Sequence, residues 1–266
     1  MGINDIEIVK SFEGLDWCLD AIGAPKVWDK TKGEGVKIAL IDTGVDASHP
    51  DLKDKVKYNF NAIDRSYNVT DEMGHGTMTA GLLVGEKTGV APNAELYSIK
   101  VLDSNGHGSM AHVMDGISNA ISLGVDILSI SLGASYHIPL IIEQRIVDAC
   151  SKGIIVVGAV GNDGANEPMY PAKLREAIGV GGYDRNFRHV DFSNRGHNVL
   201  APSTEILSTF RDGGYARMSG TSFASPLVAG GIALTISYYR SIGKELKPKE
   251  IKDMIYGNFD LTKLIK

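Results

Sequence analysis

Residues 125–162 read VDILSISLGASYHIPLIIEQRIVDACSKGIIVVGAVGN, and this stretch decides the fold. Two short runs rich in Val and Ile lie at its ends, at 125–133 and 154–162. Between them, residues 138–153 carry apolar side chains at helical spacing and finish at Gly153, where a C-terminal helix cap belongs. A strand, a helix and a second strand in this order predict two parallel strands joined by a crossover helix.

The same alternation of short apolar runs with longer helical patterns extends along the chain. Strand candidates lie at 36–42, 94–102 and 177–183, and a second crossover helix is expected at 110–124. The pattern predicts an α/β fold, a three-layer, doubly wound, mainly parallel sheet with helices on both faces. Further short strands and a long apolar helix are expected at 199–203, 205–210, 215–219 and 222–239, with a last helix starting near Pro248. In such a sheet, ligands bind beyond the carboxyl ends of the strands.

The composition indicates one globular domain. The 266 residues are 43% apolar and 22% charged, and no internal repeat or Pro/Ser-rich linker divides them, so residues 1–266 are treated as a single domain. The formal net charge of -5 lacks the basic excess of nucleic-acid-binding proteins, so no nucleic-acid partner is expected. No stretch approaches the ~20 apolar residues of a membrane-spanning helix, so no membrane partner is expected either.

The cysteine and histidine patterns predict neither a disulfide framework nor a metal site. The two cysteines, Cys18 and Cys150, lie far apart and are expected to be buried free thiols. The histidines form no metal-spaced pair. The first residues lack a basic start followed by an apolar run, which argues against a signal peptide. We expect a cytoplasmic protein; the alternative is a secreted mature form whose signal and pro-segment were removed.

Two residues at element boundaries are candidates for acid–base chemistry. Asp42 ends the apolar run 36–42, where a poorly hydrated carboxylate needs hydrogen bonds or a cationic partner, such as an imidazole that it orients. The alternative is a turn aspartate that accepts from local backbone N–H groups. His75 stands between two glycines at the start of a helical segment of small residues. The alternative is a helix cap or a surface histidine, and the pairing with Asp42 favours the acid–base role.

Ser222 and Asn162 are candidates for a nucleophile and an oxyanion donor. Ser222 lies in the run GTSFASP, residues 220–226, at the start of the long apolar helix, where free N–H groups and the helix dipole favour a developing oxyanion. A plain helix cap is the alternative. Asn162 follows the strand candidate at 154–162 and presents an amide donor at the same edge of the sheet. For this residue the alternative is a turn asparagine.

Together these segments resemble the four signature segments of the subtilisin family of serine peptidases. The matching segments are Asp42-Thr43-Gly44, His75-Gly76-Thr77, Gly161-Asn162 and residues 220–226, in the family's order. The resemblance covers residues 24–230 and implies a serine endopeptidase that works through an acyl-enzyme. It implies that Ser222 is the nucleophile, that His75 moves the proton and that Asp42 orients His75. It also implies that Asn162 and the Ser222 N–H hold the oxyanion, and that the chemistry needs no cofactor.

The resemblance further implies that a polypeptide substrate pairs, like an added strand, with residues 104–108 and 131–134. Glycines in these segments suit close approach of another chain. Met169 is expected at the floor of the main specificity pocket, where its side chain should disfavour the largest aromatic residues. The substrate-binding residues expected on this basis are Gly106, Gly108, Ser131, Leu132, Gly133, Gly161 and Met169. The oligomeric state stays open.

Two departures from the family pattern carry expectations. The path from His75 to residues 90–92 is shorter than in secreted members of the family, and the missing residues would form the loop that holds a structural calcium ion. Only Asp51 remains as a ligand, so we expect this calcium site to be absent. Whether a different calcium site exists stays open. Residues 1–20 are a candidate N-terminal extension resembling that of the intracellular branch, in which such a segment blocks the active site. Residues 6–9 are the candidate blocking segment, and an edge strand is the alternative.

Two other functions compete with the endopeptidase. One is an inactive module that keeps the fold and the peptide groove, although a binder has no need of all four motif residues. The other is an aspartic peptidase built on Asp42-Thr43-Gly44. That mechanism needs two carboxylates sharing a proton, and the chain has no second Asp-Thr-Gly, so it would require a dimer.

Overall fold

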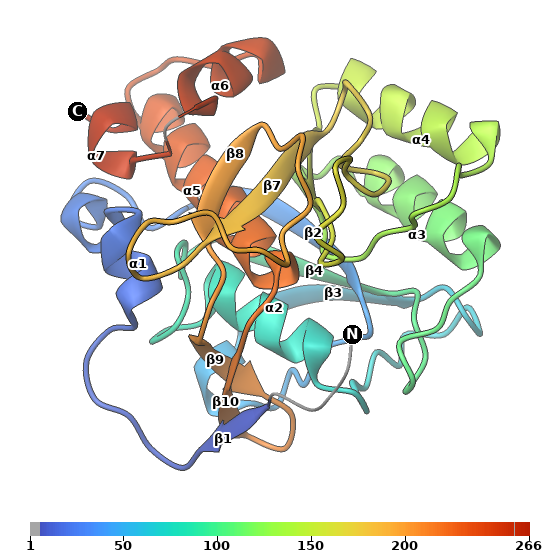
Figure 1. Ribbon diagram of the computed structural model, residues 1–266, viewed down its shortest axis with the longest axis horizontal. Coiled ribbons are helices and arrows are strands. Elements are labelled where there is room, and N and C mark those ends of the chain that lie inside the picture. Colours follow the sequence, from blue (N-terminus) through green and yellow to red (C-terminus); the bar gives the residue numbers. More distant parts are fainter. Residues whose placement is uncertain (1–5, 258) are drawn as a thin grey trace.

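The computed structural model describes residues 6–257 and 259–266 and contains a seven-stranded sheet in the order β3-β4-β2-β5-β6-β7-β8 (Figure 1). Every neighbouring pair in this sheet is parallel. The strands are β2 (Lys37–Asp42), β3 (Val56–Asn61), β4 (Glu95–Lys100), β5 (Ile127–Ile130), β6 (Ile155–Ala159), β7 (Ile178–Tyr183) and β8 (Val199–Pro202). The expected mainly parallel sheet is confirmed, and the strand β3, whose polar residues Lys57, Asn59 and Asn61 hide an apolar pattern, is additional.

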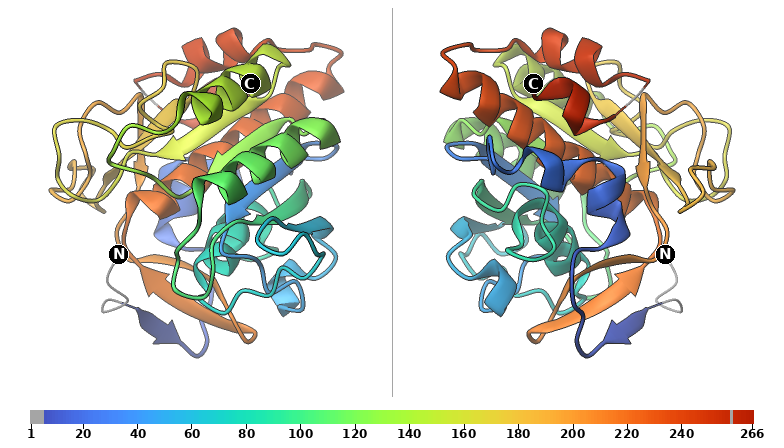
Figure 2. Two further views of the ribbon diagram at one scale, coloured as in Figure 1. Left: turned by 90° about the vertical axis from the view of Figure 1, so that its right-hand side faces the viewer. Right: turned by 90° about the vertical axis from the view of Figure 1, so that its left-hand side faces the viewer.

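Helices cover both faces of this sheet. The helices are α1 (Trp17–Ala21), α2 (His75–Val84), α3 (Met110–Leu123), α4 (Leu140–Ser151), α5 (Thr221–Ser241), α6 (Pro248–Ile255) and α7 (Leu261–Leu264), with short 3-10 turns at Ala24–Val27 and Pro50–Leu52. The two views of Figure 2 face opposite sides, with the green α3 and yellow-green α4 nearest in one and the orange-red α5 in the other. The expected three-layer architecture is confirmed.

Strand β2 shows how the period of two along a strand divides the core between the two faces. Ile38 and Leu40 belong to the larger apolar core, with α2 and α5, whereas Ala39 and Ile41 belong to the smaller core, with α3 and α4. Helix α5 is buried from Thr221 to Ser237, so over this stretch it is enclosed by protein on every side. Of the two thiols expected to be buried, Cys18 is buried, but Cys150 is only half-buried and packs at the margin of the smaller core.

A second sheet joins the N-terminal segment to the elements of the site; its strands at 205–210 and 215–219 were expected, but their separate antiparallel pairing was not. Strand β10 (Gly214–Met218) lies between β9 (Ile206–Phe210) and β1 (Glu7–Val9), and all pairs are antiparallel. Arg217 of β10 is paired with the buried Asp16 at 2.7 Å. Residues 6–9 were the candidate blocking segment, with an edge strand as the alternative; residues 7–9 form the edge strand β1. Residues 1–5 of the expected extension lie outside the described residues.

Candidate active site

A cavity of about 400 Å³ lies at the carboxyl edge of the large sheet and gathers residues from separate segments between Thr43 and Ser222. His75, Asn162 and Ser222 all line it. Of the expected substrate-binding residues, those that line it are Gly106, Ser131, Leu132, Gly133, Gly161 and Met169. Gly108 instead lines the adjoining apolar cavity. The sequence-predicted residues thus converge on one region, with Asp42 behind His75.

Asp42 and His75 form a buried pair. The Nδ1 atom of His75 lies 2.7 Å from Oδ1 of Asp42, and the two residues are 8% and 1% exposed. The Asp42 carboxylate also accepts from the Thr43 N–H at 2.7 Å and from the Thr79 hydroxyl at 3.2 Å. These partners compensate a carboxylate that burial would otherwise destabilise. Among the described residues, no second carboxylate is hydrogen-bonded to Asp42, which does not fit the dyad of an aspartic peptidase.

The pKa of His75 is set by two opposing effects. Burial lowers the pKa because it disfavours the charged ring, whereas the negative charges of Asp42 and, more weakly, Asp71 raise it. The raising effects win, so the pKa stands above the ordinary imidazole value. Such an imidazole is a good proton acceptor whose cation is stabilised by its neighbours.

Glycines flank His75 because the local packing leaves no room for a side chain. Gly74 has φ of 93°, and a Cβ there would lie 2.4 Å from the ring of Phe210. A Cβ at Gly76 would lie 2.0 Å from the carbonyl oxygen of Gly44. The start of α2 is therefore pressed against β9 and against the turn after Asp42, which fixes the backbone of His75.

Asn162 is oriented by the first residue of α5. Its Oδ1 accepts from the Thr221 N–H at 2.8 Å and from the Thr221 hydroxyl at 2.9 Å. The same hydroxyl accepts from the Gly161 N–H at 3.2 Å. Because the carbonyl oxygen of the amide is occupied by Thr221, the Nδ2 donor is the part of Asn162 that remains for a ligand in the cavity.

Ser222 is the second residue of α5 and is 2% exposed. Backbone N–H groups in the first turn of a helix have no intrahelical acceptor, so this position offers donors beside the hydroxyl. The next residue, Phe223, lies with its ring centroid 5.6 Å from that of His75. The first turn of α5 therefore lies against the imidazole of the Asp42–His75 pair.

The adjoining apolar cavity, of about 310 Å³, extends this region along the surface. It shares Leu102, Gly106, His107, Leu132 and Gly133 with the cavity of His75 and Ser222. Its remaining walls come from α3, α4 and the segments around Tyr136 and Tyr170. The two cavities thus form one groove, with the polar side chains of His75, Asn162 and Ser222 at one end and an apolar cavity at the other.

Met169 lies between two of the expected substrate-binding glycines. A Cβ at Gly133 would lie 3.0 Å from the Cβ of Met169, and one at Gly161 would lie 2.8 Å from its Cγ. The Met169 N–H donates to the Val160 carbonyl at 2.8 Å, which ties this residue to the end of β6. The thioether side chain therefore occupies space beside both segments that border the cavity.

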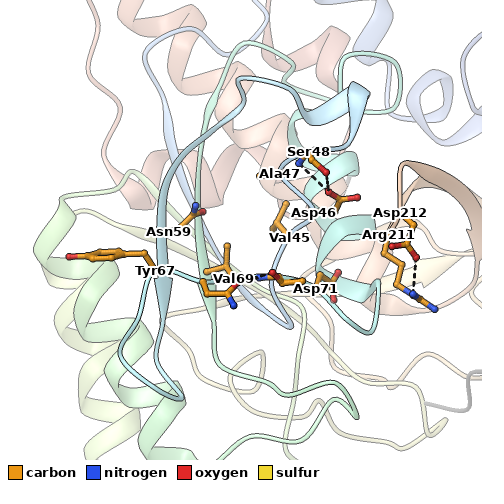
Figure 3. A pocket seen from close by; sticks show the side chains of 12 residues that line it. Val45, Asp46, Ala47, Ser48, Asn59, Tyr67, Val69, Asp71, Arg211 and Asp212 are labelled. Atoms are coloured by element: carbon orange, nitrogen blue, oxygen red, sulfur yellow. Dashed lines mark hydrogen bonds and ion pairs between the residues drawn. The ribbon is translucent and has the colours of Figure 1, made fainter.

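A larger cavity, of about 450 Å³, has polar walls but no pairing of a nucleophile with a base (Figure 3). The carboxylate of Asp46 accepts from the Ser48 hydroxyl at 2.6 Å and from the Gly213 N–H at 3.2 Å. Arg211 and Asp212 form an exposed ion pair at its rim. Its charged groups are satisfied by their neighbours, so we assign the chemistry to the cavity of His75.

Asp51, the remaining ligand of the expected calcium loop, is occupied by the chain itself. Its carboxylate accepts from the Lys87 N–H at 2.8 Å and from the Thr88 hydroxyl at 3.0 Å. Both donors lie in the short loop after α2. Within residues 6–257 and 259–266, no group of three or more His, Cys, Asp or Glu side chains is placed to hold a metal ion.

Three residues of the site were not singled out from the sequence. Thr221 stands beside Ser222 and orients Asn162, and Asp71 and Thr43 hold the segment that carries His75. Asp71 lies four residues before His75, and this closeness in the sequence was the available signal. Its partners, however, can be identified only from the folded chain.

Comparisons with known proteins agree with this geometry. The model of the subtilase family matches residues 33–262. A thermophilic serine proteinase of Bacillus sp. (strain AK1) is 40% identical over 80% of this chain and 55% of its own length. Thermitase of Thermoactinomyces vulgaris is 39% identical over 83% of this chain and 81% of its own. The major intracellular serine protease of Bacillus subtilis (strain 168) is 36% identical over 88% and 79%. The chain thus spans about half of the first relative and about four-fifths of the other two.

Proposed function

This chain belongs to the subtilase family and is a subtilisin-like serine endopeptidase, and from that premise we propose that Ser222, His75 and Asp42 are its catalytic triad. The observation that carries the assignment is the buried 2.7 Å contact between Asp42 and His75 on the cavity that Ser222 also lines. Ser222 Oγ attacks the peptide carbonyl carbon while His75 takes the hydroxyl proton. Asp42 keeps the imidazole in the productive tautomer and stabilises its cation.

The tetrahedral intermediate places a negative charge on the former carbonyl oxygen. The Ser222 N–H and the Asn162 Nδ2 group are the proposed donors to this oxyanion, because Thr221 already occupies the other end of the Asn162 amide. His75 then gives its proton to the leaving amine as the C–N bond breaks. A water molecule, deprotonated by His75, attacks the ester and releases the second product.

The groove accounts for a polypeptide substrate. Its backbone would pair with residues 104–108 and 131–134, and the side chain before the scissile bond would enter the space beside Met169. An apolar side chain further upstream would fill the adjoining apolar cavity. These contacts predict a preference for small or medium residues at the cleavage site and for an apolar residue upstream of it.

Two further properties follow from the relatives and from Asp51. We propose an intracellular location, supported by the likeness to the intracellular serine proteases of Paenibacillus polymyxa and Bacillus subtilis. In the described part of the chain, no helix has the length and apolar character to cross a membrane. We also propose that the loop after α2 needs no calcium, since its donors are bound by Asp51. We expect the amides of this loop to exchange hydrogen at equal rates in the presence of calcium and in the presence of a chelator.

The decisive experiment is labelling with a fluorophosphonate, which reacts with an activated serine. We expect one modified residue, Ser222, and loss of both labelling and casein digestion in Ser222→Ala. Ser225→Ala is a matched control, because Ser225 is a buried hydroxyl on the same helix that does not line the cavity. Labelling at another residue, or casein digestion that persists in Ser222→Ala, would overturn the assignment.

A further inference from the structure

Asp71 is a buried carboxylate outside the triad that binds an unusual number of donors around His75. It is 4% exposed. Its Oδ1 accepts from the Gly74 N–H at 2.8 Å, the Met73 N–H at 3.2 Å and the Thr43 hydroxyl at 2.8 Å. Its Oδ2 accepts from the Thr77 N–H and the Thr77 hydroxyl, both at 2.7 Å. A carboxylate offers about four lone-pair positions, so Asp71 is saturated.

These contacts hold the backbone on both sides of the histidine. Gly74, just before His75, donates to Asp71. Gly76, just after it, donates to the Thr43 hydroxyl at 2.9 Å, and that hydroxyl in turn donates to Asp71. The Thr43 N–H donates to the same Asp42 oxygen that His75 contacts. One network therefore joins the residue after Asp42 to both neighbours of His75.

We propose that Asp71 is a positioning residue of the peptidase, which sets the imidazole of His75 between Asp42 and Ser222 by tying the first turn of α2 to Thr43. The inference rests on the proposed function, because it assumes that His75 is the base. Its competitor is a purely structural role, in which Asp71 only caps α2 in place of the N-cap residue Gly74, which has no side chain.

The charged groups around His75 allow a readout that a structural role would not affect. Asp42 lies at the end of β2 and Asp71 in the loop before α2, while Lys100 of β4 donates to the Thr43 carbonyl and pairs with Glu72 at 3.0 Å. From α5, the ring of Phe223 contributes no charge. Both carboxylates raise the pKa of His75 against the effect of burial. Replacing Asp71 with a neutral residue should therefore move the acid limb of activity to lower pH.

Asp51 provides a matched control. It is also a buried carboxylate, 3% exposed, and it holds the loop at the other end of α2 through Lys87 and Thr88. Both Asp71→Asn and Asp51→Asn remove a charge and weaken a backbone anchor of the same helix. The two variants should lower thermal stability alike, but only Asp71→Asn should affect the histidine.

The test compares kcat, KM and the acid limb of kcat/KM on one fluorogenic peptide, with the active fraction counted by complete fluorophosphonate labelling. For Asp71→Asn we expect kcat per labelled site to fall about 10- to 100-fold, KM to change less than about twofold, and the acid limb to move to lower pH. For Asp51→Asn we expect kcat per labelled site and the acid limb to match the unmodified protein.

A second pair of variants decides the question if Asp71→Asn does not fold. Thr43→Val removes the hydroxyl between Asp71 and Gly76 but keeps the carboxylate, and Thr43→Ser restores the hydroxyl. We expect kcat to fall in Thr43→Val and most of the loss to be recovered in Thr43→Ser. Equal kcat in Thr43→Val and Thr43→Ser overturns the proposal, as does an Asp71→Asn variant that keeps kcat per labelled site. Failure of the unmodified protein to label at Ser222 would instead refute the proposed function.

Discussion

The two sides of the proposed catalytic cavity are stabilised by different kinds of hydrogen-bonding groups. On the side of β2 and α2, the carboxylates of Asp42 and Asp71 bind His75 and its neighbours. On the side of β6 and α5, Asn162 is held by the backbone and hydroxyl of Thr221, which are neutral. The charged side should therefore govern how activity depends on pH, while the neutral side should govern the rate without affecting that dependence.

The neutral side has its own support behind Asn162. The Asn194 side chain accepts from the Asp163 and Ala165 N–H groups, each at 3.0 Å, and its backbone N–H donates to the Gly161 carbonyl at 3.1 Å. Asn194 is 1% exposed. The side-chain amide of Asn194 thus stabilises the turn that carries Asn162, as the carboxylate of Asp71 stabilises the turn that carries His75.

The largest expected effect comes from removing the charge next to His75. Asp42→Asn should lower kcat about 10⁴-fold at neutral pH, the size known for the same change in a serine peptidase triad, because the amide favours the wrong imidazole tautomer. Steady-state kinetics on a fluorogenic peptide measures it. Asp115→Asn is the control, since Asp115 is a surface aspartate that pairs with Arg65 away from the cavity. A loss below about tenfold would contradict the assigned role of Asp42.

On the neutral side, Asn162→Ala should lower kcat about 10²- to 10³-fold with little change in KM, which is the loss that the corresponding group shows in subtilisin, a relative. The acid limb of kcat/KM should keep its midpoint, because no charge is removed near His75. Asn186→Ala, in an exposed turn, serves as the control. A shift of the acid limb in Asn162→Ala would break the division between the two sides.

The pH dependence itself tests the charged side. His75 must be neutral to accept a proton, so activity falls as pH drops through its pKa, about tenfold per pH unit. Because the pKa is raised, the protonated ring persists to higher pH, and the midpoint of the acid limb should lie above the ordinary value of 6.5. A pH series of kcat/KM measures it, and a midpoint below 6.5 would mean that burial outweighs the carboxylates.

The smallest expected effect concerns specificity. Met169→Gly should raise the ratio of kcat/KM for Phe over Ala before the scissile bond by about 10-fold, because the thioether no longer fills the space beside Gly133 and Gly161. The acid limb should stay in place, as the pocket belongs to neither hydrogen-bond network. The control is Met169→Leu, which keeps a side chain of similar volume at the same position. Met114→Gly is not used as a control, because Met114 lies inside helix α3. An unchanged ratio in Met169→Gly would show that the substrate side chain binds elsewhere.

The sequence predicted what depends on local pattern. The run at 36–42 corresponds to β2, and the helices expected at 110–124 and 138–153 correspond to α3 and α4, because apolar periodicity survives in the isolated sequence. Strand β3 was missed because polar residues interrupt its pattern. The strands at 205–210 and 215–219 correspond to β9 and β10, but their pairing with β1 into a separate antiparallel sheet was missed because β1 is three residues long and largely exposed.

The same limit applies to the site. Asp42, His75, Asn162 and Ser222 stand in recognisable motifs at the ends of elements. The roles of Thr43, Asp71 and Asn194 arise from hydrogen bonds between segments about 30 residues apart, which leave no periodic trace in the chain. Sequence therefore predicts which groups react, while the folded structure is needed to show what holds them in place.

The pairing of Glu7 with Arg217 has a consequence for biosynthesis. During translation β1 emerges first, yet its partner β10 leaves the ribosome only about 200 residues later, so the loop must close late and at an entropic cost. Strand β10 also precedes the proposed nucleophile Ser222 by only a few residues. The partner of β1 and the proposed nucleophile Ser222 therefore become available at nearly the same point of translation, so the small sheet and the proposed triad can be completed only together.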